Sequence, residues 1–358
     1  MSSTFGENLK LSIFGQSHGS GIGMVLDGIP AGLPVDMDAL QKFLDRRAPG
    51  QGNWTTPRKE ADTPEFLGGM IDRFTCGAPI AAVIRNSNTR SGDYQNLSDS
   101  PRPGHADYAA HIKYGGFEDL AGGGHFSGRL TAPLCIAGGL CKQWLEEMGI
   151  HIGAHISSIG KIEDTKFDPL DPNLTAVSQS FPVISETTGK EMMDLIEKTR
   201  QVGDSIGGSI ECAVTGLPSG VGEPMFGGIE STLAQIIYGI PAVKGLVFGN
   251  TQPYGSQNND AFTIKNGEIL TTTNHAGGVL GGISNGMPIL FQVQMKPTPS
   301  IAATQNTISY SQMQPCSLNV KGRHDPCIVP RAVPVIEAAA AIAIYDLILG
   351  NTQTQRRK

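Results

Sequence analysis

Apolar residues along this chain fall into short runs typical of strands and into longer runs with helical spacing. Two short runs, at residues 22–26 and 209–214, each lead into a Gly-x-Pro-x-Gly turn. A segment with helical spacing follows each turn, at 38–47 and 230–238, and its apolar residues fall on one face. The pattern predicts a strand, a turn and a helix, twice, and a hairpin strand after each helix.

The two halves of the chain also share sequence. Residues 15–22 resemble residues 203–210, and the turn at 28–32 resembles the turn at 216–220. A third pair, 76–84 and 285–293, follows at a similar spacing. We predict a single domain, residues 1–358, built by internal duplication from two similar half-units at about 9–150 and 200–350.

Two longer segments, residues 130–148 and 333–349, have helical character and few charges on any face. Such helices are covered on several sides, so we expect them at the centre of the molecule. The strands are linked mostly by turns and hairpins, which favours antiparallel sheets over a doubly wound parallel sheet. The predicted fold class is α+β, a β-α-β sandwich of antiparallel sheets around a central helical layer. The proline-containing stretch 169–182 is expected to be a linker or an excursion from this fold.

Composition narrows the functional class. Of 358 residues, 39% are hydrophobic and 17% are charged, which suits a large globular core, and the formal net charge of -6 argues against nucleic acid as a partner. The longest apolar run, 332–349, is interrupted by Glu337 and Asp346, so we expect a buried helix and no membrane contact. No secretory signal is visible at the start, which predicts a cytoplasmic location. Six cysteines without Cys-x-x-Cys spacing predict free, mostly buried thiols.

Five short stretches, most of them rich in glycine, carry histidines or arginines at 15–19, 46–47, 102–107, 122–129 and 322–326. Arginine beside imidazole in a glycine loop is typical of a site that binds phosphate or carboxylate and transfers a proton. We therefore interpret the five stretches as one anion-binding active site for a small molecule.

His18 carries the strongest single signal, because the matching loop of the second half-unit has Ile206 at that place. The loop itself does not require a histidine. His105 follows Arg102 in a stiff turn and precedes Asp107, where the alternative is a His-Asp pair that only bonds its own turn. Asp325, just before the last helix, is either functional or a helix cap.

Other features of these loops leave alternatives open. Arg46 and Arg47 end a helix, where the dipole alone favours one cation. The stretch 296–300 offers an ammonium and hydroxyls, a weak motif. The His- and Asp-bearing loops, with 274–277, could also hold two metals in a hydrolase, but no His-x-His, His-x-x-x-His or Asp-x-Asp pair supports this, so no metal is expected.

In order along the chain, these loops resemble those of chorismate synthase, from about residue 9 to residue 349. The blocks that carry the resemblance are 14–19 (Phe-Gly-Gln-Ser-His-Gly), 55–62, 102–108 (Arg-Pro-Gly-His-Ala-Asp-Tyr), 113–115, 274–284 and 322–327 (Gly-Arg-His-Asp-Pro-Cys). The resemblance implies a lyase that converts 5-enolpyruvylshikimate 3-phosphate to chorismate and phosphate by anti 1,4-elimination, the last step of the shikimate pathway in aromatic amino acid biosynthesis. It further implies reduced FMN as cofactor with no net redox change, an association with NADP, and a homotetramer. No dinucleotide-binding unit is visible in the sequence, so a separate flavin reductase is expected.

The resemblance also implies roles for individual residues. His105 would be the acid near the phosphate, His18 would protonate or orient the reduced flavin, and Asp325 would assist the flavin atom that takes up the proton. The implied substrate-binding residues are Arg47, Arg102, Ser127, Gly128, Arg129 and Arg323. The implied cofactor-binding residues are His125, Phe126, Ser127, Pro241, Ala242, Gly281, Lys296, Pro297, Thr298, Pro299, Ser300 and Arg323.

Several residues depart from the family pattern beside the expected cofactor. They are Gln16 in place of Glu, Asn53 in place of Arg, His125-Phe126 in place of Arg-Ser, and Pro241 in place of Asn. Two alternatives to the lyase follow: a flavin- or anion-binding protein on the same fold that has lost turnover, and a metal-dependent phosphohydrolase.

Overall fold

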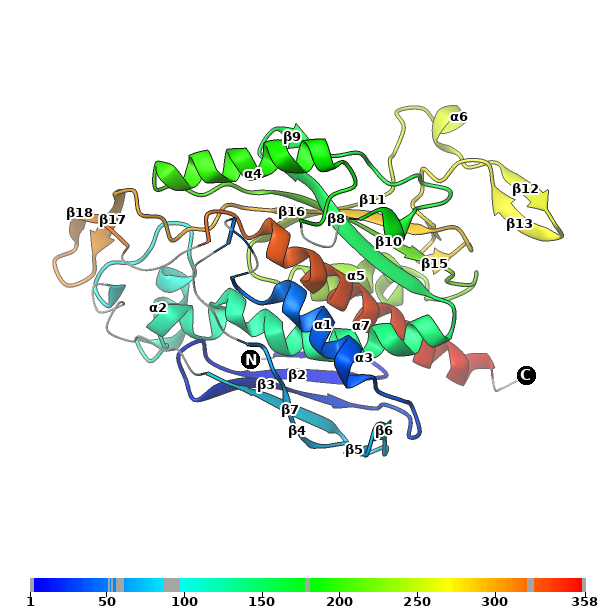
Figure 1. Cartoon of the computed structure of the whole chain (residues 1–358), viewed down its shortest axis with the longest axis horizontal. Helices are drawn as coiled ribbons and strands as arrows, with labels where there is room; N and C mark the ends of the chain where they lie inside the picture. The colour runs from blue at the N-terminus through cyan, green and yellow to red at the C-terminus, as the bar shows by residue number, and fades with distance from the viewer. Residues whose placement is uncertain are drawn as a thin grey trace.

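The computed structural model describes residues 3–50, 52, 54–55, 61–86, 97–177, 181–320 and 325–355. Figure 1 shows a layer of helices between two antiparallel sheets, with one further helix outside the second sheet. The predicted α+β class and the β-α-β sandwich are confirmed by this arrangement.

The first sheet has the order β1-β2-β3-β7-β4. These strands span Thr4–Phe5 (β1), Lys10–Gly15 (β2), Gly21–Asp27 (β3), Ile80–Arg85 (β7) and Glu65–Gly68 (β4). Buried Ile22, Met24 and Leu26 alternate along β3 and face the helices. The short hairpin of β5 (Met70–Ile71) and β6 (Phe74–Thr75) lies at the edge of this sheet.

The second sheet has the order β11-β16-β10-β8-β9. Its strands span Val243–Phe248 (β11), Ile289–Met295 (β16), Gly208–Thr215 (β10), His151–Ile159 (β8) and Ile162–Glu163 (β9). The helix α4 (Glu186–Gln201), which the sequence analysis did not predict, covers the outer face of β8 and β9 (Figure 1).

Four helices fill the space between the sheets: α1 (Met37–Arg47), α3 (Thr131–Glu147), α5 (Ile229–Ile237) and α7 (Val329–Gln355). α3 and α7 are the two apolar segments predicted at the centre, and they run parallel, with Cys135 beside Pro334 and Trp144 beside Tyr345. Gly138 permits this approach, because a Cβ there would overlap Ala338. α7 is long and apolar enough to span a membrane, but 83% of that stretch is buried inside the fold.

The same order of elements occurs twice. β3, α1, β7 and α3 in the first half correspond to β10, α5, β16 and α7 in the second. Both turns use left-handed glycines, Gly28 and Gly32 in one and Gly216 and Gly220 in the other, as a Gly-x-Pro-x-Gly turn requires. β3 pairs with β7 and β10 pairs with β16, so the matched sequence segments form matched strand pairs.

The remaining elements are short. They are α2 (Asp107–Tyr114), α6 (Gly255–Asn258), the hairpins β12–β13 (Phe262–Lys265, Glu268–Thr271), β14–β15 (Val279–Leu280, Ile283–Ser284) and β17–β18 (Gln305–Ser309, Gln314–Leu318), and the 3-10 turns η2 (Ala121–Phe126), η3 (Gly128–Leu130), η4 (Leu174–Ala176) and η5 (Met225–Gly227). The predicted excursion at 169–182 contains η4, and its described part leads from β9 to α4.

Candidate active site

The glycine-rich loop before α3 brings two distant histidines together. Gly122, Gly123 and Gly124 have φ of +62°, +83° and +53°, a left-handed backbone that suits glycine. A Cβ on Gly122 would overlap the imidazole of His18, and a Cβ on Gly123 would lie 3.2 Å from Nε2 of His105. The loop therefore needs glycine here, because both imidazoles pack directly against its backbone.

The His18 loop, between β2 and β3, is tied to its surroundings by backbone hydrogen bonds. The Ser17 N–H donates to the Gly124 carbonyl at 3.1 Å, which joins the two loops. On the other side, Asn86 Nδ2 donates to the Gly19 carbonyl at 2.9 Å. These bonds fix the position of the histidine relative to the glycine loop.

His105 belongs to a compact group with Arg102 and Asp107. Arg102 donates from Nε and Nη2 to the two oxygens of Asp107, at 2.7 and 2.8 Å, and from Nη1 to Ser300 Oγ at 3.1 Å. Nδ1 of His105 lies 2.5 Å from Asp107 Oδ1. Asp107 also accepts the Arg102 backbone N–H at 3.0 Å, so it stabilises the turn and orients the imidazole at once.

The charges of this group decide which nitrogen of His105 is available. Burial alone raises the pKa of Asp107, but hydrogen bonds from Arg102 and His105 lower it well below its ordinary value. An ionised carboxylate at 2.5 Å holds a proton on Nδ1. Nε2 therefore remains for proton transfer, on the side that faces Gly123.

The segment 296–300 lies beside the same turn. Lys296 Nζ donates to the Gly104 carbonyl, and the Lys296 N–H donates to the Ala242 carbonyl at 2.9 Å. Ala242 has a φ of +73°, unusual for a residue with a side chain and typical of functional segments under strain. Thr298 Oγ1 is buried and has no hydrogen-bond partner among the described residues. Burial lowers the pKa of Lys296, and the nearby Lys244 lowers it further.

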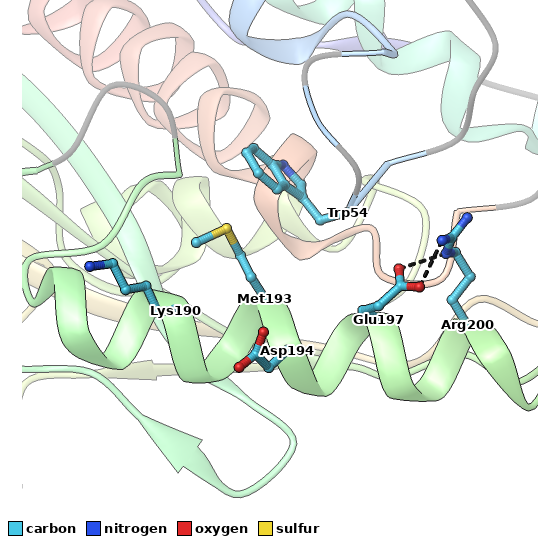
Figure 2. Close-up of a pocket in the computed structure, with 6 residues that line it drawn as sticks. All are labelled: Trp54, Lys190, Met193, Asp194, Glu197 and Arg200. Carbon is cyan, nitrogen blue, oxygen red and sulfur yellow. Dashed lines mark hydrogen bonds and ion pairs between the residues drawn. The ribbon is translucent and has the colours of Figure 1, made fainter.

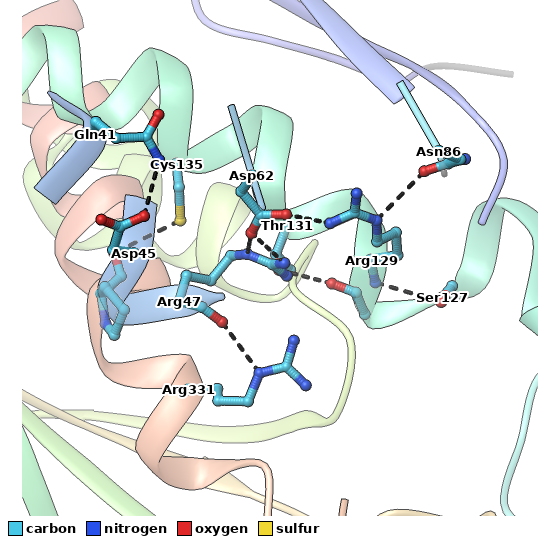
Figure 3. Close-up of polar contacts among 12 residues, drawn as sticks. Gln41, Asp45, Arg47, Asp62, Asn86, Ser127, Arg129, Thr131, Cys135 and Arg331 are labelled. Carbon is cyan, nitrogen blue, oxygen red and sulfur yellow. Dashed lines mark hydrogen bonds and ion pairs between the residues drawn. The ribbon is translucent and has the colours of Figure 1, made fainter. Parts of the chain in front are cut away.

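A second polar group lies at the N-terminal end of α3 (Figure 3). Buried Asp62 accepts from Arg47 Nε at 2.7 Å and also from Arg129 Nη1. Burial raises the pKa of Asp62, but the two arginines bring it below its ordinary value. Arg47 also donates to Thr131 Oγ1 at 3.3 Å, and the Arg129 N–H donates to Ser127 Oγ at 3.3 Å. Two guanidinium groups share one carboxylate, so one positive charge remains for an anion.

Arg46 and Arg47 have separate tasks. Arg46 points away from this group and forms a bidentate pair with buried Glu337 of α7, at 2.8 and 2.7 Å. Arg47 therefore contributes to the site and Arg46 to the packing of α1 on α7. The sequence alone does not decide between the two arginines.

Asp62 and Arg331 were not predicted as site residues. Arg331 donates to Asp325 Oδ2 at 2.5 Å and to the Arg47 carbonyl at 3.1 Å. Asp62 pairs with Arg129, 67 residues away, and Arg331 contacts the backbone of Arg47, 284 residues away, so no local pattern in the sequence indicated their place in the site. Asp62 lies in a polar stretch before a strand, and Arg331 lies at the start of an apolar helix. Both patterns are too common in proteins to indicate a site residue.

Some predicted residues lie apart from these groups. Gly281 is in the turn between β14 and β15, and the next residue, Gly282, lies against the backbone of Glu223 and Gly228 just before α5. Ala242, in contrast, follows the other end of that helix. Figure 1 shows β15 far from α2, toward the opposite end of the molecule. The predicted Arg323 lies outside the described residues, as do His324 and Asn53.

The remaining predicted residues line the same loops. His125 Nδ1 lies 3.0 Å from the Gly15 carbonyl and Nε2 lies 2.8 Å from Ser3 Oγ, so the imidazole joins the glycine loop to the first sheet. Phe126 is partly exposed near Tyr114. Gly128 has open space where a side chain would be, and Pro299 lies against the backbone of the turn that precedes His105. Pro241 and Pro297 are the chain neighbours of Ala242 and of Lys296 and Thr298.

A cavity of about 350 Å³ lies elsewhere, between α4 and the segment at Trp54 (Figure 2). Its lining consists of Trp54, Lys190, Met193, Asp194, Glu197 and Arg200. Glu197 and Arg200 pair with each other at 2.7 Å. None of the predicted site residues lines this cavity, and we assign the function to the histidine and arginine groups instead.

Comparison with known proteins gives one result. The family model for chorismate synthase matches residues 9–349. The chorismate synthase of Lancefieldella parvula is 43% identical over 367 residues, which cover 97% of this chain and 96% of that protein. The chorismate synthase of Korarchaeum cryptofilum is 42% identical, over 96% of this chain and 97% of that protein.

A solved structure supports the same conclusion. The crystal structure of a chorismate synthase superposes with a TM-score of 0.75 at 29% sequence identity, and covers 97% of this chain and 93% of that one. The resemblance inferred from the loops is thus confirmed over nearly the whole length. The chain belongs to the chorismate synthase family.

Proposed function

We propose that this protein converts 5-enolpyruvylshikimate 3-phosphate to chorismate and phosphate at the site around residues 121–129. The observation that carries the proposal is the convergence of His18, His105, Arg102, Arg47 and Arg129 on this glycine loop. In the reaction a ring C–H bond and the C–O bond to phosphate break and a second ring double bond forms. Phosphate leaves with the electron pair of the C–O bond.

The arginines and His105 stabilise the departing phosphate. Negative charge grows on the leaving oxygen, and guanidinium groups held in place by Asp62 and Asp107 need little reorganisation to meet it. Nε2 of His105 donates a proton to that oxygen, while Asp107 holds Nδ1. The parallel helices α3 and α7 both begin at this end of the helical layer, and their dipoles favour an anion there.

The residues on the other side of the turn suit a flavin mononucleotide. The buried Thr298 Oγ1 offers a hydrogen bond that no described residue takes, and Lys296 and Ser300 offer polar groups beside it. The side-chain-free stretch Gly122–Gly124 allows a flat ring to approach the backbone. Reduced FMN, when bound, supplies an electron-rich ring that supports loss of phosphate and uptake of the ring proton without net oxidation.

The proposed roles of the other residues follow from these positions. His18, against Gly122, would orient or protonate the reduced flavin when it is bound, and Asp325 would assist the uptake of the ring proton. Ser127 and Gly128, with Arg323, complete the substrate contacts. The flavin contacts also include His125, Phe126, Pro241, Ala242, Gly281, Pro297 and Pro299.

The wider setting is part of the same proposal. A separate reductase supplies reduced FMN, with NADP as the associated nucleotide, and the protein acts in the cytoplasm as a homotetramer. The placement of Gly281 away from Ala242 in one chain is compatible with sites completed by assembly.

The carboxylates of the site argue against a metal-dependent phosphohydrolase. Asp62 and Asp107 are buried and bonded to arginines on both oxygens, so neither offers a free oxygen to a metal ion. These pairs suit binding of an anion by cationic groups instead.

Anaerobic mixing of the protein with 5-enolpyruvylshikimate 3-phosphate and dithionite-reduced FMN tests the function. Chorismate absorbance and phosphate release are followed together, with oxidised FMN as the control. We expect equal amounts of both products, and only with reduced flavin. Phosphate without chorismate would support the hydrolase, and flavin binding without either product would support a protein that has lost turnover.

A further inference from the structure

Arg331 occupies an unfavourable place for a cation. It is the third residue of α7, where the positive end of the helix dipole disfavours positive charge. The side chain is mostly buried, and burial lowers the pKa of Arg331. A residue at such a position requires compensating contacts.

Two contacts fix the Arg331 guanidinium. Nη1 donates to Asp325 Oδ2 at 2.5 Å. Nε donates to the Arg47 carbonyl at 3.1 Å, as Figure 3 shows. Arg47 is the last residue of α1, where backbone carbonyls lack partners within the helix and attract a cation. The guanidinium is thus held by one helix end on one side and presents its other edge to a carboxylate.

The same contacts link two parts of the site. Arg47 bonds Asp62 through its side chain and Arg331 through its backbone. Asp325 is therefore connected through a single arginine to the group that holds Arg47 and Arg129. The substrate carries a phosphate and two carboxylates, so an unbalanced Asp325 would repel it.

We propose that Arg331 is a positioning residue for Asp325: it orients this carboxylate and balances its charge against the anionic substrate. The proposal rests on the proposed function, in which Asp325 assists proton uptake. Arg331 itself does not contact the substrate, and its effect passes through Asp325.

A double-mutant cycle tests this route. The wild type, Arg331→Gln, Asp325→Asn and the double variant are assayed for kcat and KM with reduced FMN. We expect Arg331→Gln to lower kcat/KM by roughly 10- to 100-fold, as for residues that orient a functional group. In the Asp325→Asn background the same change should cost less than about 3-fold. Equal losses in both backgrounds would overturn the proposal, because Arg331 would then act without Asp325.

A second readout needs neither flavin nor substrate. Urea midpoints of the same four proteins report whether the pair is formed in the free protein, and we expect the two single changes to be non-additive. Additive midpoints would mean that the pair does not form, and would also overturn the proposal. If Arg331→Gln does not fold, Arg331→Lys replaces it, because the ammonium can keep one of the two partners.

Arg46→Gln is the matched control. It removes a guanidinium from the same end of α1 and breaks a pair with Glu337, but it does not touch Asp325. We expect a lower urea midpoint with kcat/KM within about 3-fold of the wild type; a loss as large as that of Arg331→Gln would mean that general loosening of this helix end explains both.

The cycle also separates this proposal from the proposed function. A wild type without lyase activity contradicts the function, while the urea midpoints still test the pair. An active wild type with an equally active Asp325→Asn contradicts the role of Asp325, and with it the proposal.

Discussion

At the residue scale, the chemistry of the site depends on which atoms are already engaged. Asp107 is hydrogen-bonded to Nδ1 of His105 and to two nitrogens of Arg102. Nε2 is therefore the nitrogen of His105 that can exchange a proton. Asp62 does the same for the arginines at the start of α3. The carboxylates thus hold the cations in place, and the cations bind the anion.

Replacement of His105 by alanine tests its role as the acid. We expect His105→Ala to lower kcat by roughly 100-fold or more, because a general acid is lost at the leaving oxygen. FMN affinity should stay near the wild-type value. Anaerobic turnover and flavin titration measure the two effects, and a turnover close to that of the wild type would remove His105 from the mechanism.

Substitution of Gly122 tests the contact between the glycine loop and His18. Gly122 and Gly115 both have a φ of +62°, but a Cβ on Gly122 would overlap His18 whereas a Cβ on Gly115 meets nothing within 4 Å. Both alanine substitutions should therefore lower the free energy of unfolding by about 1–2 kcal/mol through backbone strain. We expect only Gly122→Ala to lower kcat as well, by roughly tenfold or more, because His18 is displaced. Equal kcat values in the two variants would contradict the importance of this contact.

At the scale of elements, the hydrophobic pattern predicted α1, α3 and α5 to within one residue at each end. α7 begins four residues before its predicted start, because its first turn includes Arg331, whose charge interrupts the apolar pattern. It also extends beyond its predicted end, through the polar residues 351–355. α4 was not predicted, since mostly polar residues occupy it and only Gly189, Met192 and Ile196 are buried. The half-unit boundaries at 9–150 and 200–350 remain a prediction.

The packing of α3 on α7 depends on one small residue. A Cβ on Gly138 would overlap both the side chain and the backbone of Ala338, so α7 would have to shift. We expect Gly138→Ala to lower the free energy of unfolding by about 1–3 kcal/mol, as overpacking does. Urea denaturation measures this. Gly255→Ala is the control, because nothing lies within 4 Å of its Cβ; equal stability of both variants would show that the helices separate without cost.

At the scale of the whole molecule, the site lies where several elements end together. α3 and α7 are parallel, so their N-terminal ends lie at the same end of the layer. α1 also ends beside the first turns of α7: Arg46 donates to Glu337, and Arg331 donates to the Arg47 carbonyl. Two positive helix ends and the arginines thus make one end of the sandwich suited to an anion. The other end, with the hairpin β12–β13, carries none of the described histidine or arginine groups of the site (Figure 1).

The long excursion between β9 and α4 is held to the second sheet by a buried histidine. Nδ1 of His155 lies 3.1 Å from Asp164 Oδ2 and Nε2 lies 2.9 Å from Glu211 Oε2, while Asp164 and Glu211 also accept backbone N–H groups of Ile184 and Phe167. Burial lowers the pKa of His155, but hydrogen bonds to the two carboxylates raise it above its ordinary value.

This arrangement predicts a pH dependence of stability. A histidine with a raised folded-state pKa contributes fully below about pH 6.5, its ordinary pKa, and the contribution is lost as pH rises through the folded-state value. We expect the difference between the urea midpoints of the wild type and His155→Gln to decrease as the pH is raised from about 6 to about 9. His151→Gln, which removes an exposed histidine from the same strand, is the control for loss of an imidazole at this sheet. A constant difference for His155→Gln would contradict the charged pair.

The sequence by itself determined the strand, turn and helix that begin each half of the chain, the central place of α3 and α7, and the loops that carry histidine, arginine and glycine. These features are local, because side-chain spacing and glycine conformation act over a few residues. Only the tertiary structure decided that Arg47 and not Arg46 enters the site, that Asp62 and Arg331 belong to it, and that Gly281 lies apart from Ala242. Each of these depends on charges or backbones brought together from distant parts of the chain, and such pairing follows from the packing of whole elements, which no short stretch of sequence encodes.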